Sequence, residues 1–221
     1  MKRTDAEIVR YSTKERVVHT AAVLAFLYVL LTGLAFWTPG LYWIAVVLGG
    51  GFLSRLLHPW AGLLLFAIVL WMLAMWHADM RTTDADRRWR EALLAYVRNE
   101  DADVPAAGRF NYGQKVFFWM MLWGASLLAI SGLVLWFPEA VPRDARVVRQ
   151  IAALVHAVAA LVVIGAFIIH VYMGVWVVPG SVDAILHGTV TRDWARQHHR
   201  RWANETASPP RTVESHADVS H

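Results

Sequence analysis

The sequence predicts an all-α integral membrane protein, a four-helix bundle with its N- and C-termini in the cytoplasm. Of its 221 residues, 57% are hydrophobic, which is above the about 45–50% that is usual in soluble domains. The hydrophobic residues form four runs long enough to cross the apolar core of a bilayer, which is about 30 Å thick. Lysine and arginine residues gather on one side of these runs, and this asymmetry sets the predicted orientation.

Each of the four runs can form one spanning helix, because a helix needs about 20 apolar residues to cross the core. A fifth apolar stretch, 41–53, is shorter and contains three consecutive glycines. We expect it to form an interfacial helix instead of a further span. The predicted spans cover residues 17–37, 56–77, 116–137 and 151–178.

The polar segments complete the predicted organisation. The charged loop 79–110 contains apolar residues at helical spacing over 89–97, which favours a helix on the membrane surface. We assign residues 1–202 to one transmembrane domain and residues 203–221 to a polar tail that we expect to be disordered. The first apolar run is too long for the core of a signal peptide, so we expect the N-terminus to be retained.

The basic residues orient the bundle. Seventeen lysines and arginines lie in the two terminal segments and in the loop between the second and third spans, whereas four lie on the opposite side. The positive-inside rule places the more basic side in the cytoplasm, which predicts a multi-pass membrane protein with both termini and the long central loop on that side. Because these residues flank the apolar runs, contact with anionic lipid explains them, and we expect no nucleic-acid partner.

Cysteine is absent from the chain. This composition excludes disulfides, thiolate nucleophiles, iron–sulfur clusters held by cysteines of this chain, and haem attached through a C-x-x-C-H motif. If the chain transfers electrons, its own cofactors are held by non-covalent ligation. Any iron–sulfur cluster then belongs to a partner protein.

Four histidines inside the predicted spans match one another in depth. His156 and His170 are fourteen residues apart on the fourth span, about 40° short of four full turns, so both project from nearly the same face and lie about 21 Å apart along the axis. His58, followed by Pro59 in the first turn of the second span, matches the depth of His156, and His19 matches that of His170. Ionisable residues inside a membrane are costly and usually functional, and imidazoles bind haem iron. We therefore predict a di-haem cytochrome b with two non-covalent haems b.

The remaining histidines serve as a comparison. A single histidine in an apolar span usually satisfies a neighbouring backbone group, and it is the depth-matched set of four that favours ligation. His77 lies nineteen residues after His58, is rotated about 100° from it and adjoins Asp79, so we expect it to be interfacial. We expect the histidines of the C-terminal segment to be solvated, although His198 and His199 could instead contact a partner or lipid headgroups.

A second group of polar residues lies where the chain enters the third span from the cytoplasm. Residues 111–115 read Asn-Tyr-Gly-Gln-Lys. One interpretation is a helix start, with Asn111 as the cap, Gly113 at the bend and Lys115 as a snorkelling anchor. The other is a polar niche in which the amides of Asn111 and Gln114 bind quinone carbonyls beside the cytoplasmic histidine pair. The spacing alone favours the helix start.

These residues lie in motifs that resemble the gamma (cytochrome b556) subunits of membrane-bound formate dehydrogenases. The similarity runs from about Val9 to Trp202. The four-helix di-haem architecture is shared with cytochrome b subunits of nickel–iron hydrogenases and related quinone reductases. The motifs are RLLHP (55–59), GRFNYGQK (108–115), FW (118–119), LVHA (154–157), IHVYM (169–173) and WARQHH (194–199).

The resemblance implies a role in a larger complex of the bacterial cytoplasmic (inner) membrane. In that family the equivalents of the four paired histidines bind the haems, and the residues matching Asn111, Gly113 and Gln114 line the quinone site. A molybdenum- or tungsten-containing alpha subunit oxidises formate on the outer face, and an iron–sulfur beta subunit relays the electrons. This chain would then reduce menaquinone or ubiquinone, bearing the quinone-reduction site and not the formate-oxidation site.

Two other functions remain open at this point. A cytochrome b subunit of a nickel–iron hydrogenase, or of a related quinone reductase complex, would keep the haems and exchange the soluble partner. A proton or ion transporter would use the intramembrane histidines without haem. The identity of the neighbouring genes would distinguish a hydrogenase subunit from a formate dehydrogenase subunit. The colour of the purified protein would distinguish a haem protein from a transporter without haem.

Overall fold

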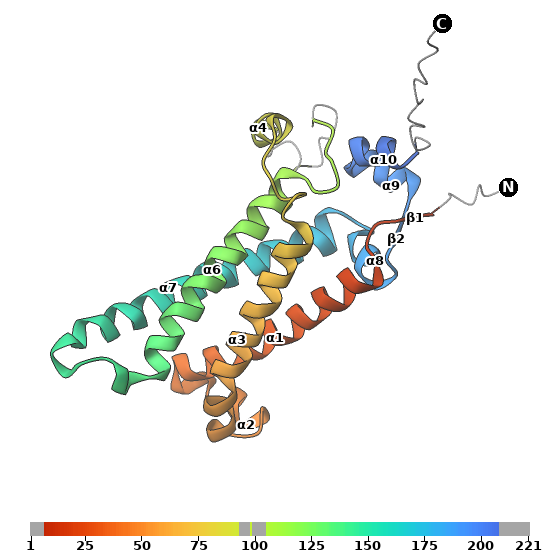
Figure 1. Ribbon diagram of the computed structural model, residues 1–221. Helices are drawn as coiled ribbons and strands as arrows, with labels where there is room; N and C mark the ends of the chain where they lie inside the picture. Colours follow the sequence, from red (N-terminus) through yellow and green to blue (C-terminus); the bar gives the residue numbers. More distant parts are fainter. Residues whose placement is uncertain (1–6, 93–97, 99–104, 208–221) are drawn as a thin grey trace, which may run out of the picture.

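Four long helices form the body of the molecule, and short elements lie at both ends of the bundle (Figure 1). The computed structural model describes residues 7–92, 98 and 105–207. All four helices are long and apolar enough to cross a membrane, so the predicted helical membrane fold is confirmed. They are α1 (Thr13–Trp37), α3 (Gly51–Trp76), α6 (Tyr112–Trp136) and α7 (Arg146–Tyr172), and α7 continues as the π-helix η5 (Met173–Val177).

The chain between α1 and α3 does not form the single interfacial helix predicted over 41–53. Gly49 and Gly50 take φ angles of 96° and 98°, a left-handed backbone that glycine adopts without steric cost. These two residues end the preceding short helix, and α3 begins at the next residue, before its predicted start. The connection consists of the 3₁₀ helix η1 (Pro39–Leu41) and the helix α2 (Trp43–Val47).

The early start of α3 changes the setting of His58. Pro59 lies inside α3 and not in its first turn as predicted. Because proline has no N–H, one backbone hydrogen bond of α3 is missing directly beside His58. Because α3 begins at Gly51, His58 lies about two turns inside the helix, where its ring can be held by neighbouring helices.

Reciprocal capping boxes fix the starts of two spanning helices. Before α1, the Ser12 side chain accepts a hydrogen bond from the backbone N–H of Glu15, whose carboxylate accepts one from the backbone of Ser12. Before α6, Asn111 and Gln114 form the same arrangement. Each box satisfies two N–H groups that the first turn would otherwise leave without partners.

The two ends of the bundle are built differently. At the end that we call the sheet end, β1 pairs antiparallel with β2, and Ile8 lies opposite Val190 (Figure 1). This small sheet was not part of the predicted all-α fold. Its strands have three residues each, which is too short for an alternating sequence pattern to be detected. The opposite end, the loop end, carries η1, α2, η3 (Pro138–Ala140) and η4 (Arg143–Ala145). The sheet end comprises β1 (Glu7–Val9), α4 (Asp84–Glu91), α8 (Ser181–Leu186), β2 (Thr189–Thr191), α9 (Arg192–His198) and α10 (Arg200–Ala207).

Apolar side chains from all four long helices form the core between these ends. Gly124 of α6 lies against the side chain of Val163 of α7, where a Cβ atom would collide. The two helices therefore approach closely, as small residues allow in membrane proteins. The buried core residues are Val18, Ala25, Phe26, Leu65, Ile68, Val69, Leu122, Ala125 and Val163.

Two predictions for the polar segments are tested only in part. The tail that we expected to be disordered from residue 203 begins as a helix, because α10 continues to Ala207 and Ala203 is buried against the small sheet. Residues 208–221 lie outside the described part of the chain. The surface pattern over 89–97 begins inside α4, and its remainder also lies outside the described residues.

Candidate functional site

The structure brings the four intramembrane histidines together as two pairs. His58 of α3 and His156 of α7 form the loop-end pair, with ring centroids 6.5 Å apart. His19 of α1 and His170 of α7 form the sheet-end pair, with centroids 6.4 Å apart. These are the pairs predicted from depth, so one face of α7 carries a member of both.

Both spacings fit an iron atom held between two imidazoles. A metal–nitrogen bond is about 2 Å long and the ring nitrogen lies about 1.2 Å from the ring centre, so two axial imidazoles place their centroids about 6.4 Å apart. In the described part of the chain, no group of three or more His, Cys, Asp or Glu side chains could hold a metal ion. Sites with two histidines suit haem, because the porphyrin supplies the other four ligands of the iron.

At the loop end, each histidine ring is hydrogen-bonded to a hydroxyl. Nδ1 of His58 lies 2.7 Å from Oγ1 of Thr32, and Nδ1 of His156 lies 3.0 Å from Oγ of Ser131. Each hydroxyl donates its own proton to the carbonyl four residues earlier in its helix. With the hydroxyl proton on that carbonyl, the oxygen can accept from Nδ1–H, and this tautomer has an unprotonated Nε2 that is able to bind a metal. Neither hydroxyl residue was among the predicted site residues.

The sheet-end pair has different surroundings. Phe117 of α6 lies flat on the ring of His170, with centroids 4.2 Å apart and planes 6° apart. Among the described residues, no hydrogen bond reaches the rings of His19 and His170. Aromatic packing, and not a hydrogen-bonded hydroxyl, is the contact that orients the His170 ring.

Asn111 and Gln114, which we predicted to form either a helix start or a polar niche for quinone, form the capping box at the start of α6. Oδ1 of Asn111 accepts a hydrogen bond of 2.9 Å from the backbone of Gln114, and Oε1 of Gln114 accepts one of 3.0 Å from the backbone of Asn111. The capping interpretation of Asn111 is therefore confirmed. Because both side-chain oxygens bind the backbone, the amide NH₂ groups are the parts of these side chains that can donate to another molecule.

Lys115 is not the snorkelling anchor that we predicted. Its Nζ is buried and donates to the carboxylate of Asp86 in α4 at 2.8 Å and to the carbonyl of Arg81 at 2.8 Å. Burial alone would raise the pKa of Asp86, but the hydrogen bonds from Lys115 and Thr83 lower it below its ordinary value. This buried ion pair fixes α4 against the start of α6.

His199 is also not solvated as expected. Only 1% of its surface is exposed, because it lies between two parts of the chain that are distant in sequence. Its Nδ1 is 2.8 Å from the carbonyl of Gly108, and its Nε2 is 3.0 Å from the guanidinium of Arg10. Burial lowers the pKa of His199 well below its ordinary value, and the charge of Arg10 lowers it further, so the ring is neutral.

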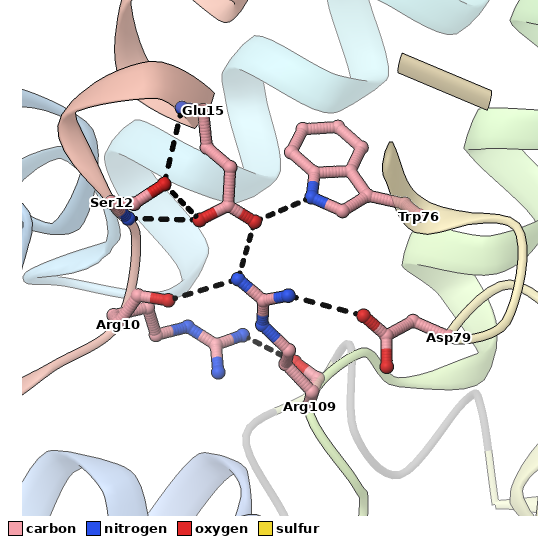
Figure 2. Close-up of polar contacts among 6 residues, drawn as sticks. All are labelled: Arg10, Ser12, Glu15, Trp76, Asp79 and Arg109. Carbon is pink, nitrogen blue, oxygen red and sulfur yellow. Dashed lines mark hydrogen bonds and ion pairs between the residues drawn. The ribbon is translucent and has the colours of Figure 1, made fainter. Parts of the chain in front are cut away.

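A charged network lies beside these groups at the sheet end (Figure 2). Arg109 forms ion pairs with Glu15 of α1 and with Asp79, and it donates to the backbone carbonyl of Arg10. Trp76, the last residue of α3, donates to the same carboxylate of Glu15 at 2.6 Å. The network joins the start of α1, the end of α3 and the segment that leads into α6.

Two further predicted non-ligands, His77 and His187, belong to neither histidine pair. His77 caps the end of α3 and is exposed. His187 is exposed and lies 3.6 Å from the carboxylate of Asp183. His216 and His221 lie outside the described residues.

Comparison with known proteins identifies the family of the chain. Residues 10–190 match the family model described as prokaryotic cytochrome b561. The chain is 35% identical over 206 residues to the formate dehydrogenase cytochrome b556(fdo) subunit of Escherichia coli (strain K12), covering 93% of this chain and 95% of that protein.

Two further relatives have the same kind of name. The nitrate-inducible formate dehydrogenase cytochrome b556(Fdn) subunit of Escherichia coli (strain K12) is 30% identical over 96% of this chain and 97% of its own length. The formate dehydrogenase cytochrome b556 subunit of Haemophilus influenzae is 30% identical over 91% of this chain and 84% of its own length. The chain therefore belongs to the prokaryotic cytochrome b561 family, as a membrane cytochrome b of the formate dehydrogenase type.

Proposed function

We propose that the chain is the di-haem electron-transfer subunit of a formate dehydrogenase and passes electrons from an iron–sulfur beta subunit to quinone. The observation that carries this proposal is the presence of two histidine pairs, one near each end of the bundle, with centroids 6.5 and 6.4 Å apart. Both spacings suit bis-histidine haem b, and the family supports a cytochrome b.

The two pairs take different roles in the proposal. His58 and His156 hold the haem that faces the beta subunit, and His19 and His170 hold the haem that faces quinone. Bound haem b supplies one-electron transfer at each site. The chain contributes the four imidazoles, the apolar helices that exclude water from them, and the side chains that orient the rings.

The quinone site lies at the start of α6 in this proposal. Asn111 is the N-cap of that helix, Gly113 and Gln114 lie in its first turn, and Phe117, on the next turn, packs on His170. The NH₂ groups of Asn111 and Gln114 would donate hydrogen bonds to the carbonyl oxygens of menaquinone or ubiquinone. A glycine between them leaves room for a planar ring to approach the backbone.

The orientation follows from the distribution of charge. The sheet end carries most of the lysines and arginines, so we propose that it lies in the cytoplasm, where protons for quinone reduction are available. The loop end then faces outward in the bacterial inner membrane. There it meets the beta subunit, which connects it to the molybdenum or tungsten alpha subunit.

The test is haem analysis of the purified chain within its complex. We expect two non-covalent haems b per chain in a pyridine haemochrome assay, with both reduced by formate. A protein without haem would contradict the electron-transfer function and favour the transporter alternative. Haems that are reduced by hydrogen and not by formate would assign the chain to a hydrogenase.

A further inference from the structure

We propose that two hydroxyl–glycine pairs, Thr32-Gly33 in α1 and Ser131-Gly132 in α6, position the two haem-binding histidines of the loop end. The inference rests on the proposed function, because it requires haem between His58 and His156. It assigns a role to four residues of the spanning helices that bind neither haem nor quinone themselves.

The hydroxyls fix which nitrogen of each ring is free. Oγ1 of Thr32 donates to the carbonyl of Tyr28 at 2.7 Å, and Oγ of Ser131 donates to the carbonyl of Leu127 at 2.6 Å. A histidine that binds iron through Nε2 carries its proton on Nδ1, and the hydroxyl oxygen, whose own proton can go to the helix carbonyl, accepts from that Nδ1–H. Both hydroxyl residues are buried, with 0% and 4% of their surfaces exposed, so water does not compete for these bonds.

A glycine follows each hydroxyl and faces the histidine ring, with less free space at Gly132 than at Gly33. A Cβ atom on Gly33 would lie 3.6 Å from Cε1 of His58, and a Cβ atom on Gly132 would lie 3.3 Å from Cε1 of His156. Each glycine therefore faces the ring carbon between the two nitrogens, and at Gly132 a side chain would press on the ring. The hydroxyl sets the rotation of each ring and the direction of Nε2, and at His156 the tight contact with Gly132 limits that rotation further.

The arrangement occurs twice, on separate pairs of helices. α1 packs against α3 and supplies the hydroxyl–glycine pair for His58, while α6 packs against α7 and supplies the pair for His156. The sequence shows the repetition, since Thr32-Gly33-Leu34 and Ser131-Gly132-Leu133 share one pattern. No such contact exists at the sheet-end histidines among the described residues.

The expected consequence is a lower reduction potential for the loop-end haem than its ligands alone would give. An acceptor on the second nitrogen makes a ligating imidazole more basic, which stabilises oxidised iron. Loss of such a partner typically changes metal affinity by about ten- to hundredfold. A tenfold change in the ratio of affinities for oxidised and reduced iron corresponds to about 59 mV for a one-electron couple.

The test compares Thr32→Val and Ser131→Ala with Ser126→Ala in the complete chain. Ser126 is a matched control, because it lies in α6 and bonds to the carbonyl four residues earlier, with no contact to a histidine. We expect Thr32→Val and Ser131→Ala each to raise the reduction potential of the same haem, the one at the loop end, and to shift the low-spin EPR signal of that haem. The other haem, and both haems of Ser126→Ala, should be unchanged.

The conservative variants Thr32→Ser and Ser131→Thr keep the hydroxyl and should behave as the wild type. If Thr32→Val loses one haem while Thr32→Ser keeps it, the hydroxyl is required and the inference holds. If both lose it, or if Thr32→Val and Ser131→Ala leave potential and EPR unchanged, the inference is wrong. A wild-type chain without haem would instead contradict the proposed function.

Discussion

At the loop end, two buried hydroxyls bind the rings of His58 and His156, whereas no described hydrogen bond reaches the rings of His19 and His170 at the sheet end. The sheet end is nevertheless the more polar of the two. Its ion pairs, between Arg109 and Glu15 and between Lys115 and Asp86, join segments of backbone around the histidines and do not touch the rings.

This difference indicates what each end has to hold in place. A haem that only exchanges electrons with fixed neighbours needs ligands with a fixed orientation, which the hydroxyls provide. A site that a quinone enters and leaves needs firm walls around an open approach. The ion pairs of α4, α6 and the N-terminus of α1 suit firm walls, because they fix helix ends with contacts that do not use the side chains of Asn111 and Gln114.

The largest expected effect is the loss of one haem, at one end of the bundle only, when a histidine of that end is replaced. Replacing His58 or His156 by Ala should remove the same haem, about half of the haem content, because each iron loses one of its two protein ligands. Replacing His19 or His170 should remove the other haem. In the complex, His170→Ala should leave one haem that formate still reduces but that no longer reduces quinone.

His77→Ala is the control for these variants, since His77 is exposed at the end of α3. It should retain both haems with unchanged spectra. Loss of a haem in this variant would mean that the pairing by depth has chosen the wrong ligand.

The next effect should be confined to the sheet end. Asn111→Asp and Gln114→Glu preserve the capping box, because Asp and Glu accept the same backbone hydrogen bonds. Both remove the amide NH₂ that we assign to quinone. Losing a hydrogen bond to a buried partner costs about 1–3 kcal/mol, so reoxidation of reduced haem by a menaquinone analogue should slow by about tenfold or more.

Haem content and optical spectra should not change in these two variants. Unchanged reoxidation in both of them would leave helix capping as the only role of Asn111 and Gln114.

The buried ion pair tests whether the sheet end depends on its polar network for stability. Asp86→Asn leaves the ammonium of Lys115 buried without a counter-charge, which should lower stability by about 3–5 kcal/mol. The matched control is Asp84→Asn, because the Asp84–Arg87 pair is exposed and such pairs contribute about 0–1 kcal/mol. Thermal unfolding in detergent would measure both, and equal effects would contradict the prediction.

The same carboxylate predicts a pH dependence. Since the folded-state pKa of Asp86 is lowered, its contribution to stability is complete above the unfolded-state pKa of about 3.9. It is lost as pH falls through the lower, folded-state pKa. The stability difference between wild type and Asp86→Asn should therefore persist from pH 7 to about pH 4 and shrink below that value.

Helical geometry explains why the histidine pairs could be predicted. The spacing of His156 and His170 along one rigid helix fixes their relative depth and face, and the basic residues fix the depth of His19 and His58. The partners of other groups are not encoded locally. Arg10 and His199 are 189 residues apart in sequence, so no periodicity could join them.

Some local backbone features could also not be predicted from the periodicity of apolar residues. The left-handed turn at Gly49 and Gly50 shifts the start of α3, and the three-residue strands leave no alternation to detect. The hydroxyls of Thr32 and Ser131 were detectable in principle. Each is a polar residue followed by glycine inside an apolar span, a place where polarity requires an explanation.

The smallest expected effect distinguishes the two halves of the loop end from each other. Gly132→Ala would place a Cβ 3.3 Å from Cε1 of His156, which is tighter than ordinary contact, so the ring has to rotate or move by a few tenths of an ångström. Gly33→Ala would place its Cβ 3.6 Å from Cε1 of His58, which is ordinary van der Waals contact. We therefore expect a changed EPR signal of the loop-end haem in Gly132→Ala and little change in Gly33→Ala, with the sheet-end haem unchanged in both. If Gly132→Ala leaves the spectrum of the loop-end haem unchanged, Gly132 does not set the ring orientation, and the hydroxyls alone would account for the difference between the ends.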